Sequence, residues 1–208
     1  MLYELSHFIK DKMGFLWEAI EWGNAKAFAL RYAKKLKQVP AVLESASTDK
    51  VIIKSVEVPD CKALAEFFAA QPEESFKFFQ PHAFDEKTLT KLAKRESQLM
   101  FIALIEGEIV GYCFMRSFVN GQTYRGYMVD VNHRGQGIAK VMGYAMNDVA
   151  LALGLRMFKS IAPDNVASMA ATKSVCDIKI IKTLENGDYY LECFAKPADN
   201  QVVVGGGV

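Results

Sequence analysis

The amino-acid sequence predicts an α/β (α+β) fold, in which helices flank a mixed, mostly antiparallel sheet of about six to seven strands behind a helical N-terminal extension. Three observations support this prediction. Apolar residues recur at helical spacing over the first 37 positions. From residue 51 onward, short β-branched segments are separated by glycine-containing turns. Hairpin turns also alternate with helical crossovers, which favours a mixed sheet.

Composition limits the classes of partner that we expect. A chain of 208 residues with 51% hydrophobic and 24% charged residues can bury one substantial core. Its formal net charge is only +1, so the overall field gives no reason to expect a nucleic-acid or membrane-surface partner. We divide the chain into a helical extension (1–48), a main domain (49–197) and a flexible tail (198–208).

Cysteine usage and the leader region indicate the compartment. The four cysteines form no CxxC pair and lie in apolar stretches, which favours buried thiols over a disulfide frame or a zinc site, and no metal site is predicted. The N-terminus has no signal-peptide pattern, and no apolar run is long enough to cross a bilayer. We therefore expect a cytoplasmic protein. The cysteines are Cys61, Cys113, Cys176 and Cys193.

The extension is expected to be helical from Leu2 to about Lys37, with Gly14 and Gly23 dividing it into two helices and Pro40 ending it. The polar stretch "ESASTDK" is typical of a linker. The apolar stripe either covers a face of the main domain, which we favour, or forms a homodimer contact. The stripe comprises Leu5, Phe8, Ile9, Met13, Leu16 and Ile20.

The first part of the main domain is expected to contain a strand followed by helices. "VIIKSVEV" is β-branched and partly alternating, so it predicts a strand. Asp60 can cap the helix "CKALAEFFAAQ" that follows Pro59. The stretch "PEESFKFFQPHAFDEKTLTKLAKRE" predicts two short helices that are interrupted around Pro81.

The second part is expected to contain most of the strands. "QLMFIALIEGEIVGYCFMRSF" predicts two strands joined by a turn at Gly107, and Asn120-Gly121 is a hairpin signal that leads into "TYRGYMVDV". "RMFKSIAPDN" predicts a strand that ends in a helix cap, followed by the helix "VASMAATKSV". A closing hairpin then turns at Asn186-Gly187.

The segment "VDVNHRGQGIAKVMGYAM" predicts a strand, a glycine-rich turn and a helix, which is an arrangement that often binds phosphate. A dinucleotide fingerprint fails because Lys140 stands where its third glycine belongs. A Walker A loop fails because neither its glycine spacing nor its Lys-Ser/Thr is present. Backbone N–H groups from Gln136 to Ala139 would nevertheless be free donors at a helix N-terminus. Gly135 and Gly137 would let an anion approach them, and Arg134 would add a charge-assisted contact.

Arg134, Gly137 and Ala139 fit the pattern R/Q-x-x-G-x-G/A, which resembles the pyrophosphate-binding signature of the GNAT superfamily of acyl-CoA-dependent N-acyltransferases. "APDNVASMAATKSV" is similar to the second CoA-binding segment of that family, with Asn165 at the matching position. The resemblance covers roughly residues 51–196 and implies a GNAT-like sheet, acetyl-CoA as co-substrate and acetyl transfer to a small primary amine.

The resemblance also implies which residues hold the cofactor. In the family, a bulge splays the strand before the glycine turn, and the backbone of that strand pairs with the pantetheine arm. Here Met128, Val129 and, as an open choice, Val131 match those positions, with an N–H near Val129 facing the thioester oxygen. The implied cofactor-binding set is Met128, Val129, Arg134, Gly135, Gln136, Gly137, Ile138, Ala139 and Asn165.

The general acid is where this sequence departs from the resemblance. Many family members carry a tyrosine seven residues after the asparagine, and here that position is Thr172. Either another group protonates the leaving thiolate or the thiolate leaves unaided, since a thiol pKa of roughly 8.5 makes it a tolerable leaving group. Tyr127 is the replacement that we select. Other candidates are Tyr112, Tyr124, Tyr189 and Tyr190, and any of the five could instead be a packing aromatic.

The proton of the attacking amine needs a base, and His82 is our first candidate. It falls in "FFQPHAFDE", a region that lines the acceptor side in the family, and histidine titrates in the useful range. An equally simple interpretation is a histidine that packs in a proline turn. Glu73, Glu74 and Asp130 are further candidates, whereas His7 lies outside the matching domain and His133 should lie near phosphate.

The acceptor amine is left open. "FFQPHAFDEKTL" resembles acetyltransferases found with bacterial surface-polysaccharide genes, which favours an amino sugar or its nucleotide, with a peptide or a polyamine as alternatives. A non-catalytic acyl-CoA-binding module and an ATP-binding protein are competing hypotheses. Phe68, Phe76, Phe78 and Phe79 could stack on a sugar or nucleobase, or form core.

Overall fold

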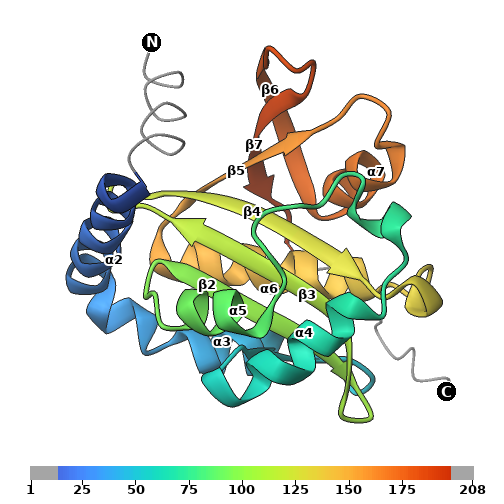
Figure 1. Cartoon of the computed structure of the whole chain (residues 1–208). Coiled ribbons are helices and arrows are strands. Elements are labelled where there is room, and N and C mark those ends of the chain that lie inside the picture. The colour runs from blue at the N-terminus through green and yellow to red at the C-terminus, as the bar shows by residue number, and fades with distance from the viewer. Residues whose placement is uncertain (1–13, 198–208) are drawn as a thin grey trace, which may run out of the picture.

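The structure is a computed structural model and describes residues 14–197 (Figure 1). Its centre is a seven-stranded sheet with the order β1-β2-β3-β4-β5-β7-β6. Only the β4–β5 pair is parallel, and the other neighbours are antiparallel. This arrangement confirms the predicted mixed, mostly antiparallel sheet flanked by helices.

Two helices precede the sheet, α2 (Gly14–Leu36) and α3 (Val39–Ala46). The predicted division at Gly23 is wrong, because α2 continues through that residue without interruption. Pro40 does not end the segment but lies in the first turn of α3, where its missing N–H leaves no hydrogen bond unmade. The predicted linker "ESASTDK" accordingly begins inside a helix.

Both helices pack on the main domain, as the covering interpretation predicts. Phe28, Tyr32 and Leu43 are buried in the same apolar cluster as residues of helix α6 (Ile138–Leu153). The predicted stripe is wrong at Ile20, which is 48% exposed, because the buried face of α2 passes through Phe28 and Tyr32 instead. Leu5, Phe8, Ile9 and Met13, and the side chain of Leu16, lie outside the described part of the chain.

Short elements follow the first strand. The predicted cap at Asp60 is wrong, because its carboxylate bonds the Glu57 N–H at 2.9 Å and Lys54 Nζ at 2.8 Å and thus serves the preceding 3-10 turn. Asp85 does cap its helix, accepting from the Thr88 N–H at 2.9 Å. The elements are β1 (Ile52–Ser55), a 3-10 turn (Val58–Asp60), α4 (Cys61–Ala69), a 3-10 turn (Glu73–Phe76) and α5 (Glu86–Ala93).

The remaining strands form where expected, and the three predicted hairpin turns contain glycines of positive φ, namely Gly107, Gly121 and Gly187. One boundary differs, because β4 ends at Val129 and Val131 lies in a 3-10 turn. The elements are β2 (Gln98–Ile105), β3 (Glu108–Ser117), β4 (Gln122–Val129), the turn Val131–His133, β5 (Arg156–Ile161), α7 (Val166–Val175), β6 (Cys176–Thr183) and β7 (Tyr189–Ala195).

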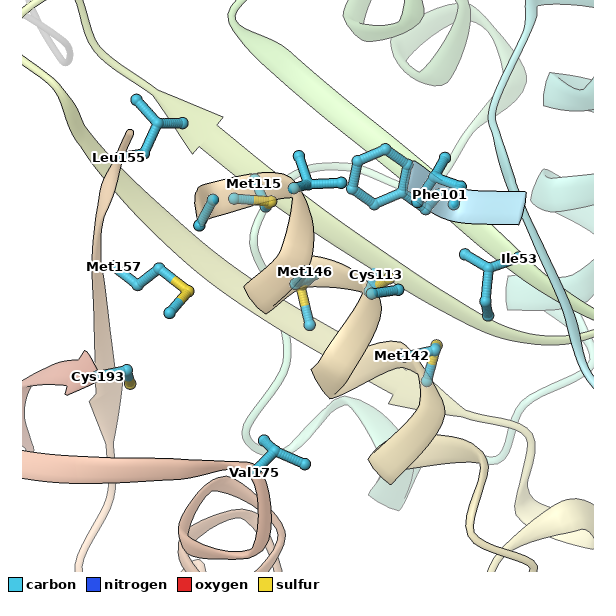
Figure 2. Close-up of a cluster of buried hydrophobic side chains, with 14 of the residues drawn as sticks. Ile53, Phe101, Cys113, Met115, Met142, Met146, Leu155, Met157, Val175 and Cys193 are labelled. Atoms are coloured by element: carbon cyan, nitrogen blue, oxygen red, sulfur yellow. The ribbon is translucent and has the colours of Figure 1, made fainter. Parts of the chain in front are cut away.

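The sheet has an apolar core on each face. Helix α6 packs on one face, where Met142 and Met146 meet Cys113 and Met157 (Figure 2). Helices α4 and α5 cover the other face around Phe68. All four cysteines are buried free thiols, as predicted. Within residues 14–197, none of the helices has the length and apolar character that crossing a bilayer requires.

Strands β4 and β5 separate after a short contact. They pair only from Gln122 to Tyr124, so β4 loses its neighbour on that side for its last five residues, 125–129. The register between β3 and β4 runs without a shift, so the bulge expected at this point is not what opens the sheet. The resulting gap, named the β4–β5 gap below, begins beyond Tyr124 and Phe158.

Candidate active site

The glycine-rich turn gives α6 an open N-terminus. Gly135 and Gly137 have φ values of 76° and 80°, a region that side chains other than glycine rarely adopt. Gly137 is the N-cap residue, and no side chain caps the helix. A Cβ atom built on either glycine would meet nothing within 4 Å. The turn therefore keeps free space directly before the helix, and a phosphate group fits that space.

Backbone donors face this space. The Lys140 and Val141 N–H groups bond the Gly137 carbonyl at 2.9 and 3.1 Å. By contrast, the N–H groups of Ile138 and Ala139 find no acceptor among the described residues. Unpaired donors at the positive end of a helix dipole attract an anion. The first turn of α6 therefore has the properties that the sequence predicts for a pyrophosphate cradle.

Cationic side chains surround the cradle. Arg134 is exposed and donates to Ser75 Oγ at 2.8 Å, linking the glycine turn to the 3-10 turn after α4. Lys50 Nζ donates to Gln136 Oε1 at 3.0 Å. Neither cation is paired with a carboxylate in these contacts, so both can exchange a neutral partner for phosphate.

The backbone N–H and C=O groups of β4 point alternately towards β3 and towards the β4–β5 gap. The Asp130 N–H bonds the Val110 carbonyl on β3 at 2.9 Å. Since strand groups alternate in direction, Met128 also directs its backbone towards β3, while Tyr127 and Val129 direct theirs into the β4–β5 gap. The backbone groups of Met128 are therefore directed away from the gap, whereas those of Val129 have the required direction. Val131 is also excluded as a donor, because its N–H bonds Gln71 Oε1 at 3.1 Å.

Asn165 lies where the sequence places it, at the start of α7. Its Oδ1 accepts from the Ser168 N–H at 3.0 Å and so caps the helix. Figure 1 shows α7 beyond the end of β5 and the glycine-rich turn that leads into α6 beyond the end of β4. The two segments of the predicted cofactor site therefore flank the β4–β5 gap.

The five candidate tyrosines differ in their surroundings. The hydroxyls of Tyr124 and Tyr190 bond each other at 2.9 Å, and Tyr189 packs against the core. Tyr112 is fully buried next to His82, and burial raises its pKa well above the usual value. Tyr127 has a buried hydroxyl with no hydrogen bond of regular geometry among the described residues; burial raises its pKa, and its proximity to Thr172 and Ser168 partly opposes that rise.

Tyr127 lies beside a buried lysine that the sequence analysis missed. The Lys159 Nζ is 4.4 Å from the centroid of the Tyr127 ring and donates to Ser168 Oγ at 3.0 Å. Burial lowers the pKa of Lys159 to about 7, and the nearby charge of Arg125 acts in the same direction. Arg125 is itself buried and bonds Asn147 and the Gly143 carbonyl.

A sequence signal for both residues existed. In "TYRGYMV" and "RMFKSI" the charged residue occupies a position that alternation assigns to the buried face, since Met157 and Ile161 are core residues on either side of Lys159. A cation at such a position is rare unless it has a function or a partner.

Both ring nitrogens of His82 already have hydrogen-bond partners. Its Nδ1 lies 2.9 Å from the Ala83 carbonyl oxygen and therefore carries the proton, so Nε2 accepts from the Tyr112 hydroxyl at 2.9 Å. Phe68 and Phe84 surround the ring. Burial lowers the pKa of His82, which keeps the imidazole neutral at pH 7. His82 is therefore packed among aromatic rings, as one interpretation predicts, and its Nε2 is still an unprotonated nitrogen that can act as a base.

The other candidate bases are placed differently. Asp130 accepts from Gln71 Nε2 at 2.7 Å and from His133 Nδ1 at 2.9 Å. Burial raises the pKa of Asp130, but these hydrogen bonds outweigh it and the net pKa is lowered, which makes it a poor base. Glu73 and Glu74 are exposed on the 3-10 turn. His133 lies one residue before Arg134, on the phosphate side as expected.

A hollow of about 590 Å³ lies between α4 and the segment that follows it. Its wall is largely aromatic, with Phe68, Phe76 and Phe84, and its edge carries Glu66 and Asp85. Phe68 is core and Phe79 packs partly buried against that core, whereas Phe78 is 43% exposed, so the four predicted stacking aromatics do not form one surface.

Comparisons with known proteins agree with this geometry. The family model described as "Acetyltransferase (GNAT) family" matches residues 63–176. Among solved structures, Mycobacterium smegmatis RimJ in complex with CoA-disulfide is 19% identical, with a TM-score of 0.60 over 75% of this chain and 86% of that chain. The GNAT domain of S. lividans PAT is 18% identical, with a TM-score of 0.59 over 67% and 88%.

A third structure is the acetyl transferase from Salmonella typhimurium that modifies the N-terminal serine of ribosomal protein L7/L12. It is 18% identical, with a TM-score of 0.59 over 72% of this chain and 96% of that chain. At this level of identity the three likenesses show a shared fold. Among curated proteins, none matches the chain significantly.

Proposed function

The chain belongs to the GNAT acetyltransferase family and is an acetyl-CoA-dependent N-acetyltransferase, and we propose here how its own residues carry out the transfer. Acetyl-CoA supplies an activated acetyl group as a thioester. The protein must hold the pyrophosphate, orient the thioester carbonyl and remove a proton from the amine. The uncapped N-terminus of α6 beside the β4–β5 gap is the observation that supports this assignment most directly.

The first turn of α6 binds the pyrophosphate in this account. The N–H groups of Ile138 and Ala139 donate to it, and Gly135 and Gly137 leave room for its oxygens. Arg134, now bonded to Ser75, adds a charge-assisted contact, and Gln136 is the remaining residue of the turn. On the other side of the gap, Asn165 lies at the start of α7 and faces the cofactor in this proposal.

The edge of β4 positions the thioester. The Val129 backbone faces the gap and lacks a β5 partner, so its N–H can donate to the carbonyl oxygen as negative charge develops there. A fixed backbone donor of this kind costs no reorganisation during the reaction. Attack is direct, with the amine nitrogen approaching the carbonyl carbon.

His82 remains our proposed base. Its lowered pKa keeps it neutral, and Nε2 is the nitrogen that can accept a proton. The Tyr112 hydroxyl donates a hydrogen bond to Nε2. The proton of the amine must therefore reach Nε2 through this hydroxyl, or directly after the hydroxyl has moved away. Phe68 and Phe84 pack around the ring, which favours a relay through the Tyr112 hydroxyl over direct contact with the amine.

The acceptor is a primary amine, and an amino sugar is the choice that the sequence favours. The aromatic hollow with Glu66 and Asp85 at its edge would also suit an ammonium group carried by an apolar neighbour, such as the α-amine of a peptide. Some structural neighbours are ribosomal-protein acetyltransferases, which makes peptides the second class to test.

Thiol release from acetyl-CoA, measured against a panel of amines, tests the function. The panel contains glucosamine phosphates, nucleotide-linked amino sugars, short peptides beginning with serine or alanine, and spermidine. Turnover above the hydrolysis background with one class supports the proposal and names the acceptor. Tight CoA binding without turnover on any amine would favour a non-catalytic acyl-CoA-binding module, for which the loss of tyrosine at Thr172 is the motivating observation.

Two further assignments belong to the proposal. We place the protein in the cytoplasm, where acetyl-CoA is available and four buried thiols stay reduced. A homodimer could form through the N-terminal helices, because Trp22 and Leu30 are exposed on α2. Sedimentation of the wild-type chain and of Leu30→Glu tests that contact, since a dimer held there should dissociate in the variant.

A further inference from the structure

Lys159 is a buried cation on the wall of the β4–β5 gap. It directly follows Phe158, the last residue of β5 that pairs with β4. Its side chain points to the α6 side of the sheet, as do those of its neighbours Met157 and Ile161, and only 9% of the residue is exposed. Lys159 therefore lies at the closed end of the gap, opposite the free edge of β4.

The surroundings of Lys159 contain hydroxyls and cations but no carboxylate. Its Nζ donates to Ser168 Oγ at 3.0 Å and to Thr172 Oγ1 at 3.4 Å, both on α7. Thr172 donates its own proton to the Ser168 carbonyl at 2.7 Å, so its oxygen is free to accept. Among residues 14–197, no acidic side chain forms an ion pair with Lys159.

Titratable groups of both signs lie near Lys159. Arg125 on β4 is buried on the same face and lowers the pKa of Lys159, whereas the thiols of Cys176 and Cys193 on β6 and β7 raise it. The hydroxyl of Tyr127, also on β4, is buried and lies close to Ser168 and Thr172 on α7. A buried cation without a carboxylate partner is costly, so its place on the wall of the gap favours a role towards an anion that forms there during function.

We propose that Lys159 is a catalytic residue that donates a proton to the leaving sulfur of CoA, in a site where Thr172 cannot supply one. This inference rests on the proposed function. As the C–N bond forms, the C–S bond breaks and its electron pair moves to sulfur. The proton on Nζ then passes to sulfur and leaves Lys159 neutral, while the proton of the amine passes to the base. Solvent restores the lysine proton after release.

The energetics of this transfer are favourable. Burial lowers the pKa of Lys159 to about 7, and Arg125 contributes in the same direction. A free thiol has a pKa of roughly 8.5, so transfer from Nζ to a CoA thiolate runs downhill. Before transfer, the buried ammonium attracts negative charge on sulfur.

The test is an ultraviolet titration of the thiol of bound CoA, with the spectrum of the CoA-free protein subtracted. It compares wild type, Lys159→Met and a control, Lys179→Met, in which an exposed lysine on β6 is changed. At pH values up to about 7, where Lys159 carries its proton, the bound thiol of the wild type should ionise about tenfold more readily than that of Lys159→Met, while CoA affinity changes less than about threefold. The control should match the wild type.

Equal thiol ionisation in wild type and Lys159→Met, with CoA bound to both, would overturn the role of Lys159 and leave the proposed function intact. If Lys159→Met does not fold, the wild type alone decides, because a bound thiol that ionises like free CoA also contradicts the proposal. If the wild type does not bind CoA, the proposed function fails, and the inference fails with it.

Discussion

Lys159 on β5 donates a hydrogen bond to Thr172 on α7, with 3.4 Å between Nζ and Oγ1. This contact joins the strand that opens the sheet to the helix that starts at Asn165. Thr172 occupies the position at which the resemblance implies a tyrosine that acts as the acid. The ammonium group of Lys159 therefore lies beside the position where this chain lacks the tyrosine. The predictions below follow from this relationship and from the cradle at α6.

Replacing Lys159 by methionine should change how stability depends on pH. Burial lowers the pKa of Lys159 to about 7, from 10.5 in the unfolded chain. Between these pH values the unfolded state binds the extra proton, so the free energy of unfolding of the wild type rises with pH, by up to about 1.4 kcal/mol per pH unit. Urea denaturation at several pH values should show that rise in the wild type and a flatter line in Lys159→Met. Parallel lines would show that the lysine is not buried as described.

Tyr127→Phe separates the selected tyrosine from Lys159 as the acid. The hydroxyl of Tyr127 is buried and makes no hydrogen bond of regular geometry, so its removal should change the free energy of unfolding by less than about 1 kcal/mol and reduce kcat by less than about threefold. Tyr124→Phe is the matched control, because it removes a tyrosine hydroxyl that bonds Tyr190 and should also leave kcat within about threefold. A loss of kcat of about a hundredfold in Tyr127→Phe alone would make Tyr127 the acid.

Gly137→Val tests the pyrophosphate cradle. The substitution places a branched side chain in the space before α6 and strains a residue with φ of 80°, so CoA affinity should fall at least about tenfold. Isothermal titration calorimetry measures the change. Gly187→Val introduces the same strain at φ of 89° in the β6–β7 hairpin and should keep CoA affinity. Equal affinities in the two variants would remove the cradle from the account.

His82→Ala should lower turnover and leave CoA affinity unchanged, because His82 lies on the α4 side of the sheet and away from the cradle. General-base catalysis typically contributes about 10² to 10⁴ in rate, so kcat should fall by at least about a hundredfold. Steady-state kinetics with the acceptor from the amine panel provides the measurement. A fully active variant would return His82 to a packing role.

Acid should destabilise the wild type partly through His82. Burial lowers the pKa of His82 below its value of 6.5 in the unfolded chain, so the neutral form is favoured in the fold. The stabilisation is present above pH 6.5 and is lost as the pH falls through the folded-state pKa. Thermal melts from pH 7 to pH 5 should therefore decline more steeply for wild type than for His82→Phe, which keeps the aromatic packing. Identical slopes would show that His82 is not buried as a neutral ring.

Sequence pattern was sufficient for the sheet and for the glycine turn, because both follow from local rules. Alternating apolar residues and glycine turns located every strand. The spacing of the glycines around Gly137 was sufficient to exclude a dinucleotide fingerprint and a Walker A loop. The helix boundaries near Gly23 and Pro40 failed, since tertiary packing on α6 outweighs the low helix propensity of one glycine.

The interior of the site could not be predicted from local pattern alone. Lys159 and Thr172 are 13 residues apart and meet only because β5 runs into α7 beside the gap. The direction of the Met128 backbone depended on the register with β3, which a one-residue shift would reverse. The pairing of His82 with Tyr112 likewise joins a loop to a strand 30 positions away.

A crystal structure of the protein with CoA bound is the most direct test of the account. We predict the pyrophosphate on the N–H groups of Ile138 and Ala139, the pantetheine arm along the free edge of β4, and the sulfur within hydrogen-bond reach of Lys159. A cofactor bound outside the β4–β5 gap, or phosphates that do not contact the first turn of α6, would contradict it.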